Sequence, residues 1–236
     1  MDLLSITQSM FMLGFVAMAA GGVWFVLERN DLKVEHRSVG TFAAVIAFIA
    51  AVMYYVMKDV VNFPGGMIDA AAIEGTMPLR YIDWLITTPL LLVEFGLIVA
   101  LAGAATKGLV SRLVIADLVM IVFGYLGETS VPGSGMAYVT FIISSLAWVY
   151  IAWLVWSLKM DDKAPAYAVR AVKSMRLFVI LGWAIYPIGT ATQQFITLGG
   201  GDLSQAAAIA AMIYVVADVL NKIGFGMIAV NAAKKA

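Results

Sequence analysis

Long, uninterrupted apolar runs constrain this chain more than any other feature of its sequence. Seven runs are each long enough to cross the hydrocarbon core of a bilayer as an α-helix, which takes about 20 residues. Short connections separate the runs and leave no room for a second domain. We therefore expect a single domain over residues 1–236, an all-α bundle of seven transmembrane helices in a lipid bilayer. The runs cover about 5–27, 39–61, 77–102, 109–128, 134–158, 170–196 and 204–232.

The composition agrees with this location and excludes several classes of function. Hydrophobic residues make up 63% of the chain and charged residues 13%, against roughly half and a quarter in soluble domains. There is no cysteine, and the single His36 lies in a charged loop, which excludes a disulfide framework and a thiolate or histidine-cluster metal site. The net charge is zero, and no basic patch suggests a nucleic-acid partner. The first run lacks the basic flank and clear cleavage site of a signal peptide, so we expect it to be a membrane helix.

Positive charges alternate between the connections. Lys and Arg occur in the first, third and fifth connections and in the C-terminal tail, whereas residues 62–76, 129–135 and 197–203 contain none. The positive-inside rule then places the N-terminus outside and the C-terminus in the cytoplasm. We expect a multi-pass protein of the cell membrane with this orientation.

Two charges interrupt the seventh run. Asp218 and Lys222 are four residues apart, so they share a helix face and can form an ion pair. A charge at this depth costs at least a few kcal/mol and usually has a function. One interpretation is a structural ion pair between packed helices. The other is that Lys222 is an amine nucleophile in a dry pocket, because a desolvated lysine loses its proton readily and forms a Schiff base with a carbonyl compound.

The third run contains a stripe of polar residues. At 100° per residue, Arg80, Asp83, Thr87 and Glu94 fall on one face, and Asp83 and Glu94 are roughly 16 Å apart along the axis. Two carboxyls at different depths suit a vertical proton relay. Leu and Val around Glu94 favour its protonated form, whereas Arg80 one turn from Asp83 favours the carboxylate. The alternative is that Arg80 and Asp83 form an interfacial ion pair and that Glu94 snorkels.

Other polar and aromatic residues also occur at mid-membrane depth. Asp117 has no charged neighbour in sequence, and we expect a protonated acid hydrogen-bonded to a neighbouring helix, with Thr88 as its partner. Aromatic residues away from the interfacial belt, next to small residues, either pack helices together or line a slot for a long, flat apolar ligand. The lysine favours the slot. The residues concerned are Trp84, Trp148, Trp183, Tyr186, Gly124, Gly182, Ser144 and Ser145.

Three segments resemble the microbial rhodopsins. Residues 80–91, RYIDWLITTPLL, resemble the third helix of that family. Residues 183–187, WAIYP, resemble the sixth, and residues 218–226, DVLNKIGFG, the seventh. The resemblance extends over all seven runs, and three motifs in this order and spacing are highly specific. Residues 94–95, 123–128, 147–150 and 221–222 are most similar to those of the bacterial proteorhodopsins.

The resemblance implies a chromophore site. All-trans retinal would be bound to Lys222 as a protonated Schiff base, with Asp83 and Asp218 as counterions and with Arg80 and Tyr54 in the same network. Thr88 and Leu91 would also line the site, and the apolar Leu91 stands where proteorhodopsins tune colour and resembles the green-absorbing type. Further implied contacts are Trp84 and Trp183 on either side of the polyene, Tyr186 hydrogen-bonded to Asp218, and Pro187, Met120, Gly124 and Trp148 around the ring.

The same resemblance implies a function. Asp83, Thr87 and Glu94 match the signature of bacterial outward proton pumps, with Asp83 as proton acceptor and Glu94 as proton donor. We therefore expect a light-driven ion transporter rather than an enzyme, and a homo-oligomer. One alternative is a photosensory rhodopsin that signals through a separate partner, although Glu94 favours pumping. Another is a retinal-free secondary transporter in which Lys222 and Asp218 bind the substrate, but no inverted repeat is evident.

The chain departs from the family pattern in three places. Met53 occupies the position of a histidine that hydrogen-bonds the acceptor aspartate in proteorhodopsins, so Asp83 lacks that partner. Residues 192–204 contain no match for the paired outer glutamates of the archaeal pumps and offer only Gln193, Gln194 and Asp202. The proton-release group is therefore not assigned by the resemblance. Phe141 replaces the Gly of antenna-binding relatives, which predicts that no carotenoid antenna binds.

Overall fold

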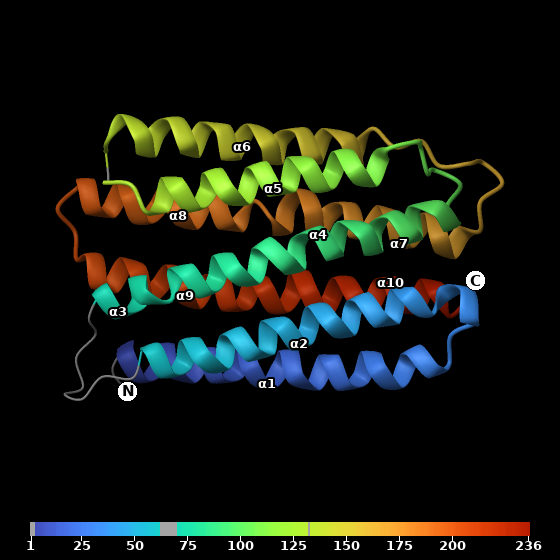
Figure 1. Cartoon of the computed structure of the whole chain (residues 1–236), viewed down its shortest axis with the longest axis horizontal. Helices are drawn as coiled ribbons and strands as arrows, with labels where there is room; N and C mark the ends of the chain where they lie inside the picture. Colours follow the sequence, from blue (N-terminus) through green and yellow to red (C-terminus); the bar gives the residue numbers. More distant parts are fainter. Residues whose placement is uncertain (1–2, 62–69, 132) are drawn as a thin grey trace.

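The computed structural model describes residues 3–61, 70–131 and 133–236 of the chain. Within these residues, seven helical segments are long and apolar enough to cross a membrane, and no strand is formed. The predicted all-α fold with seven transmembrane helices is confirmed. Figure 1 shows the helices running nearly side by side along the long axis, with the N-terminus and C-terminus at opposite ends of the bundle, as an odd number of spans requires.

Five spans follow the predicted runs closely. Their helical form follows from their apolar surroundings, because a helix satisfies its own backbone hydrogen bonds where no water is present. A short 3₁₀ turn, Val34–His36, precedes the second span. The described part of the expected connection 62–76 begins at residue 70, so its Gly-rich turn at 63–66 lies outside the described residues. The helices are α1 (Leu3–Asn30), α2 (Arg37–Val60), α3 (Ala70–Gly75), α4 (Met77–Leu101), α5 (Leu109–Glu128) and α6 (Gly135–Trp156).

The sixth and seventh spans are each divided by a π-helical turn. The turn η2 (Phe178–Gly182) joins α7 (Ala166–Leu177) to the segment before α8 (Ile185–Leu198). The turn η3 (Leu220–Gly224) joins α9 (Leu203–Val219) to α10 (Phe225–Ala233), and it packs against η2. Such turns are rare and often occur at functional sites. Lys222 lies within η3.

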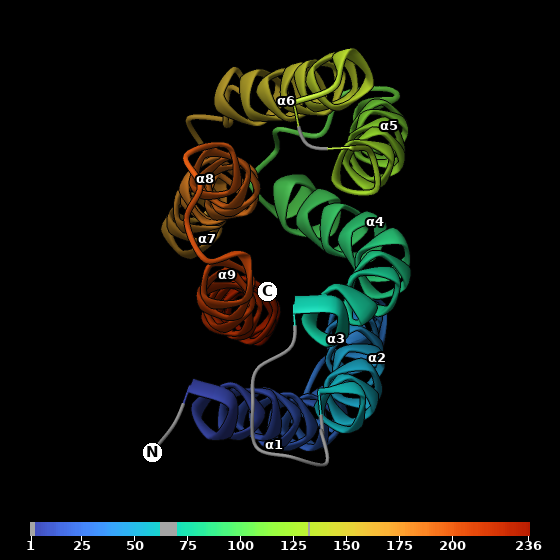
Figure 2. The ribbon, with the colours of Figure 1, turned by 90° about the vertical axis from the view of Figure 1, so that its left-hand side faces the viewer.

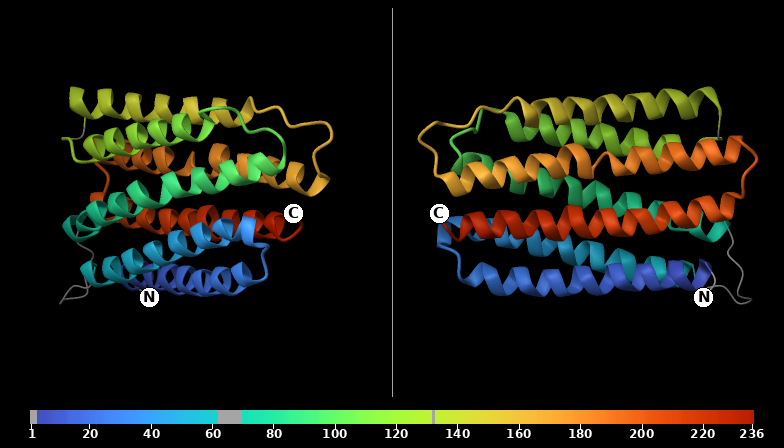
Figure 3. Two further views of the ribbon diagram at one scale, coloured as in Figure 1. Left: turned by 45° about the vertical axis from the view of Figure 1, so that its right-hand side comes forward. Right: turned by 180° about the vertical axis from the view of Figure 1, so that it is seen from behind.

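The spans follow one another around a ring. Seen from one end of the bundle in Figure 2, α1, α2, α4, α5, α6 and α8 follow in chain order, and α9 lies between α8 and α1. The two further views in Figure 3 show the same arrangement, with the seventh span flanked by the sixth and the first. The seventh span is the most enclosed: 67% of its most apolar window is buried, against 22% for the fifth span. Its two charges therefore face protein rather than lipid.

Candidate functional site

Lys222 lies between two carboxylates in the interior of the bundle. Its Nζ forms an ion pair with Asp83 Oδ2 and a second one with Asp218 Oδ2, at 3.1 Å. None of the three residues is more than 2% exposed. Burying charges costs several kcal/mol per ion unless hydrogen bonds and opposite charges compensate. The two acids and one base therefore require further donors, and the neighbouring helices provide them.

Asp218 accepts hydrogen bonds from three other side chains. Tyr54 Oη donates to Oδ2 at 2.8 Å from α2, and Tyr186 Oη donates to Oδ1 at 2.5 Å from α8. Trp84 Nε1 on α4 is 3.3 Å from Oδ1. Together with Lys222, these donors occupy both oxygens of the Asp218 carboxylate. Asp218 is thus held in place by three spans besides its own.

Asp83 accepts fewer hydrogen bonds than Asp218. Its Oδ2 contacts Lys222, and its Oδ1 has no hydrogen-bond partner among the described residues. The Thr87 hydroxyl donates to the backbone oxygen of Asp83 at 2.9 Å. Met53, at the position of the family histidine, is partly buried against the hydrophobic core. The two carboxylates beside Lys222 therefore differ sharply in their surroundings.

Arg80 does not pair with Asp83. Its guanidinium lies over the ring of Tyr214, with Cζ 5.1 Å from the ring centre, and its Nε has no partner among the described residues. Arg80 is only 8% exposed, and none of the described ion pairs includes it. The alternative of an interfacial Arg80–Asp83 pair is wrong, because Lys222 reaches Asp83 from across the bundle and takes that position.

Glu94 is completely buried. Neither carboxylate oxygen has a hydrogen-bond partner in the part of the chain that the structure describes. The alternative in which Glu94 snorkels is wrong, since a snorkelling side chain would expose its carboxyl group. An uncompensated carboxylate in such a place is very costly, so the neutral acid is the favoured form. Thr87, on the same face of α4, contacts Asp83 rather than bridging to Glu94.

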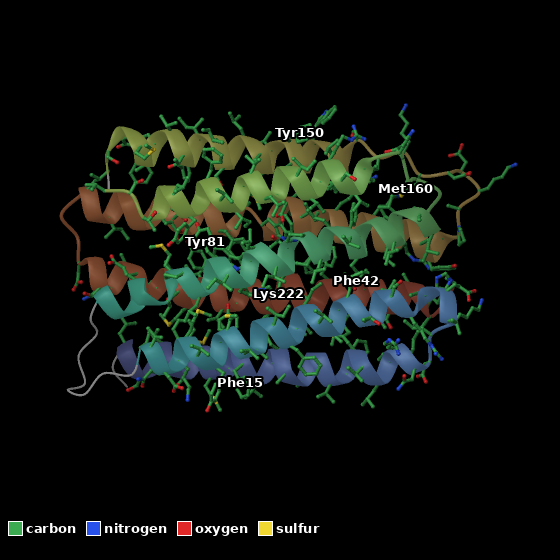
Figure 4. All side chains as sticks on the ribbon, viewed as in Figure 1. Phe15, Phe42, Tyr81, Tyr150, Met160 and Lys222 are labelled. Atoms are coloured by element: carbon green, nitrogen blue, oxygen red, sulfur yellow. The ribbon has the colours of Figure 1, made fainter. Side chains whose placement is uncertain are left out.

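A cavity extends from Lys222 between the third to seventh spans. It contains about 840 Å³ of space between atoms, including the open solvent at its mouth. Lys222 stands at its wall, and Figure 4 shows this lysine midway along the bundle between α4 and the seventh span. Tyr54 reaches Asp218 without lining the cavity. The sequence-predicted residues that line it with Lys222 and Asp218 are Trp84, Thr88, Leu91, Met120, Gly124, Trp148, Trp183, Tyr186 and Pro187.

Two polar side chains of the cavity wall, those of Ser144 and Trp148, are bonded to backbone oxygens of neighbouring helices. Ser144 Oγ donates to the backbone oxygen of Met120 at 2.8 Å, and Trp148 Nε1 donates to that of Val179 at 3.2 Å. A Cβ on Gly124 would lie 3.1 Å from the Tyr81 hydroxyl and reduce the space there. A cavity of this kind, with an amine at its wall, fits a long apolar carbonyl compound attached to lysine.

Asp117 forms the bond that we expected from its isolation in sequence. Thr88 Oγ1 donates to Asp117 Oδ2 at 2.9 Å and also contacts the backbone oxygen of Trp84 at 2.8 Å. Asp117 is fully buried. The contact joins α4 to α5 beside the cavity and confirms Thr88 as the partner.

Comparison with known proteins decides the family. The model of the bacteriorhodopsin-like protein family matches residues 5–236. The chain belongs to this family. It is 35% identical over 239 residues to the green-light absorbing proteorhodopsin of Gamma-proteobacterium EBAC31A08, covering all of this chain and 89% of that protein. The predicted resemblance to microbial rhodopsins, and to proteorhodopsins in particular, is confirmed.

Solved rhodopsin structures have the same fold. The crystal structure of Exiguobacterium sibiricum rhodopsin superimposes with a TM-score of 0.87 at 43% identity, covering 99% of this chain and 97% of that one. Xanthorhodopsin, a light-driven ion pump with a dual chromophore, gives a TM-score of 0.81 at 26% identity over 99% and 94% of the two chains. The seven spans and the family together make this chain a multi-pass protein of the cell membrane.

The rhodopsin site also contains residues that sequence reasoning missed. Tyr214 is 1% exposed, stacks on Tyr186 at 5.7 Å and carries Arg80 over its ring. Tyr214 lies four residues before Asp218, so helix periodicity puts the two residues on one face. The sequence alone could therefore have indicated Tyr214 as a site residue. Asn221 Nδ2 contacts the Tyr186 hydroxyl at 3.4 Å. Asn221 directly precedes Lys222 in the sequence, and this adjacency could have indicated it as a site residue.

The end of the cavity on the N-terminal side of the bundle contains a second missed group (Figure 1). Glu128 lines the cavity and accepts a hydrogen bond from Thr190 Oγ1 at 2.6 Å. Glu128 is the last residue of the fourth span, so a count of charges within spans passed over it. Asp202, an outer acid considered from the sequence, is exposed and caps α9 by accepting the backbone N–H groups of Ser204 and Gln205 at 2.9 and 3.2 Å. The side chains of residues 193 and 194 lie outside the described part.

Proposed function

We propose that this chain is a light-driven outward proton pump in which all-trans retinal is bound to Lys222. One observation carries the proposal: Lys222 Nζ contacts Asp83 in a dry interior, and a second buried carboxyl, Glu94, lies further along the same helix. Asp83 and Glu94 are roughly 16 Å apart along α4, so one acid can serve each side of Nζ. The similarity to proteorhodopsin over the whole chain supports the same function.

Retinal, attached to Nζ of Lys222 as a protonated Schiff base, would supply the light-driven isomerisation that changes the direction of the N–H bond. Trp84 and Trp183 would hold its chain from two sides, while Met120, Gly124, Trp148 and Pro187 would shape the ring end. Leu91 makes the wall beside the chromophore apolar, and we expect a green-absorbing pigment. Thr88 is fixed by Asp117 and completes the wall on α4.

Asp83 takes the proton from Nζ of Lys222, with which its Oδ2 is in contact. Asp218 accepts hydrogen bonds from Tyr54, Tyr186 and Trp84 on both of its oxygens, and we assign it as the fixed counterion. This asymmetry supports Asp83 as the acceptor and Asp218 as a fixed counterion.

Glu94 then returns a proton to Nζ and is refilled from the cytoplasm, and Asp83 yields its proton to the outside. Direction follows from the expected orientation, with the N-terminus outside, because α4 then runs from the outer surface inwards. Asp83 thus lies nearer the outside and Glu94 nearer the cytoplasm. Arg80 lies one turn outward of Asp83 and presents the positive charge that favours outward release.

Adding retinal to membranes that contain the expressed protein tests the chromophore. We expect a visible absorption band that Lys222→Ala abolishes and that Lys58→Ala, a matched change at a partly exposed lysine near the end of α2, leaves intact. Borohydride reduction of the pigment should leave a retinyl group on the peptide that contains Lys222. The absence of a band in the unaltered protein would reject retinal binding and favour the secondary transporter.

Illumination of unbuffered cells tests the pump. We expect a lasting acidification of the medium that a protonophore abolishes. A pigment that forms normally but produces no change of external pH would reject pumping and favour the photosensory alternative.

A further inference from the structure

Glu128 is a carboxylate at the outer side of the cavity that the mechanism above does not use. It is partly buried at the end of α5 and lines the cavity together with Tyr81 and Thr190. The Thr190 hydroxyl holds its Oε1 at 2.6 Å, so the carboxylate is fixed rather than free in solvent. In Figures 1 and 3 the C-terminal end of α5 lies at the same end of the bundle as the N-terminus, which is the expected outer side.

Hydroxyl groups connect Glu128 to the interior. Thr190 Oγ1 is 3.3 Å from the hydroxyl of Tyr214, and the Tyr214 ring stacks on Tyr186. The Tyr186 hydroxyl donates to Asp218 at 2.5 Å. The carboxylate therefore lies in the same polar cluster as the counterions, separated from Asp218 by a layer of tyrosines.

A positive charge lies beside the tyrosines that separate Asp218 from Glu128. Arg80 is stacked on Tyr214, and both Arg80 and Glu128 interact electrostatically with the side chains of Tyr214 and Tyr81. Arg80 Nε has no partner among the described residues. Arg80 and Glu128 thus act on the same two tyrosines, which places a cation and the carboxyl group at one end of the cavity. Figure 4 shows Tyr81 on the N-terminal side of Lys222 along the bundle, as this order requires.

We propose that Glu128 is the outer proton acceptor of this pump: it takes the proton that Asp83 gives up and passes it to external water. The inference rests on the proposed function. In the step, the O–H bond of Asp83 breaks and an O–H bond on Glu128 forms; the second bond then breaks and protonates external water. Both carboxylates are restored, and one proton has left. Thr190 is a positioning residue, because its hydroxyl holds Glu128 Oε1 and takes up no proton itself.

Glu128→Gln is the main test, because the amide oxygen can still accept the Thr190 hydrogen bond but cannot take up a proton. We expect an unchanged absorption band and an unchanged rate of proton loss from Lys222 Nζ after a flash. Deprotonation of Asp83 should slow by about tenfold or more. The proton should reach a pH-sensitive dye outside the membrane with the same delay. In infrared difference spectra, we expect a transient carboxylic-acid band late in the cycle that disappears in this variant.

Two further variants separate a proton-transfer role from a structural one. Thr190→Val leaves the carboxyl group but removes its hydrogen bond, and it should give a smaller delay of release with the infrared band retained. Glu128→Asp restores a carboxyl group and should recover most of the release rate. Glu74→Gln, at an exposed glutamate of α3 near the same end of the bundle, is the matched control and should behave as the unaltered protein.

The inference would be overturned if Glu128→Gln released its proton and deprotonated Asp83 at the normal rate, with the infrared band still present. The proposed pump function would not be affected by that result. Failure of the proposed function has a different signature, since the unaltered protein would then show no light-driven acidification. If Glu128→Gln forms no pigment, Thr190→Val decides: normal release kinetics there would also overturn the inference.

Discussion

At the scale of single residues, the chemistry of this protein depends on the difference between two carboxylates that share one amine. Asp218 has both oxygens occupied by donors from three other spans, whereas Asp83 has one oxygen without a partner among the described residues. A carboxylate can take up a proton readily only where its neutral form loses few hydrogen bonds and ion pairs. In the proposed pump, Asp218 is therefore assigned as the fixed counterion and Asp83 as the proton acceptor.

Replacing Asp83 with Asn removes the proposed acceptor and one of the two negative charges beside Lys222. The remaining positive charge at Nζ is then less strongly stabilised, so we expect the visible band to move to longer wavelength. Light-driven acidification should fall by about a hundredfold or more. Absorption spectra and pH recordings on the same membranes check both effects, and unchanged transport would reject the acceptor assignment.

Replacing Glu94 with Gln tests the donor. The amide has nearly the same volume and stays neutral, so we expect normal pigment formation and an unshifted band. Return of the proton to Lys222 Nζ should slow by about a hundredfold, which flash spectroscopy measures directly. A photocycle with normal timing would remove Glu94 from the relay.

At the scale of helices, the two π-helical turns bring the sixth and seventh spans into close contact beside the lysine. Gly182 in η2 lies directly against Asn221 in η3: a Cβ on the glycine would be 2.0 Å from Asn221 Oδ1 and 2.9 Å from its Cγ. Asn221 in turn contacts Tyr186, which holds Asp218. The absence of a side chain at Gly182 thus helps to position Asp218 indirectly.

Gly182→Ala should therefore destabilise the protein and disturb the pigment. Overpacking of a filled interior costs about 1–3 kcal/mol, and the shift of Asn221 should also move the absorption band. The measurement is the loss of the visible band on heating in detergent. Gly135→Ala is the control, because a Cβ there would meet no atom within 4 Å, and it should not lower stability.

At the scale of the whole molecule, the ring of spans hides its charges from lipid. The seventh span lies between the first and the sixth, and its carboxylate and amine point into protein. Large apolar side chains cover the outside, among them Leu13, Leu27, Ile115 and Leu146, each more than half exposed. In a bilayer this surface contacts acyl chains, so the arrangement separates a polar interior from an apolar exterior.

The orientation of the bundle can be measured because the chain contains no cysteine. Val131→Cys introduces a single exposed thiol in an expected outer connection, and Asp162→Cys introduces one in an expected cytoplasmic connection. We expect a membrane-impermeant maleimide to label the first variant in intact cells and the second only after the membrane is opened. The reverse pattern would invert the predicted topology and the direction of the proposed pump.

Much of the fold could be predicted from the sequence. A long apolar run in a bilayer satisfies its own backbone hydrogen bonds as a helix, so the seven spans follow from hydropathy alone. The Thr88–Asp117 contact could also be predicted, because a lone acid between apolar residues needs a donor on a neighbouring helix. The π-helical turns could not be predicted, since neither residues 178–182 nor residues 220–224 contain a proline that would mark a break in the helix.

The sequence by itself determined which residues carry charge inside the membrane and which face of its own helix each one occupies. Only the tertiary structure decided which charges meet. Asp83 pairs with Lys222 rather than with Arg80 one turn away, Glu94 is buried, and Glu128 joins Thr190 at one end of the cavity. The physical reason is that periodicity fixes directions within one helix, whereas contact between helices depends on their depth, rotation and packing, which many distant residues set together.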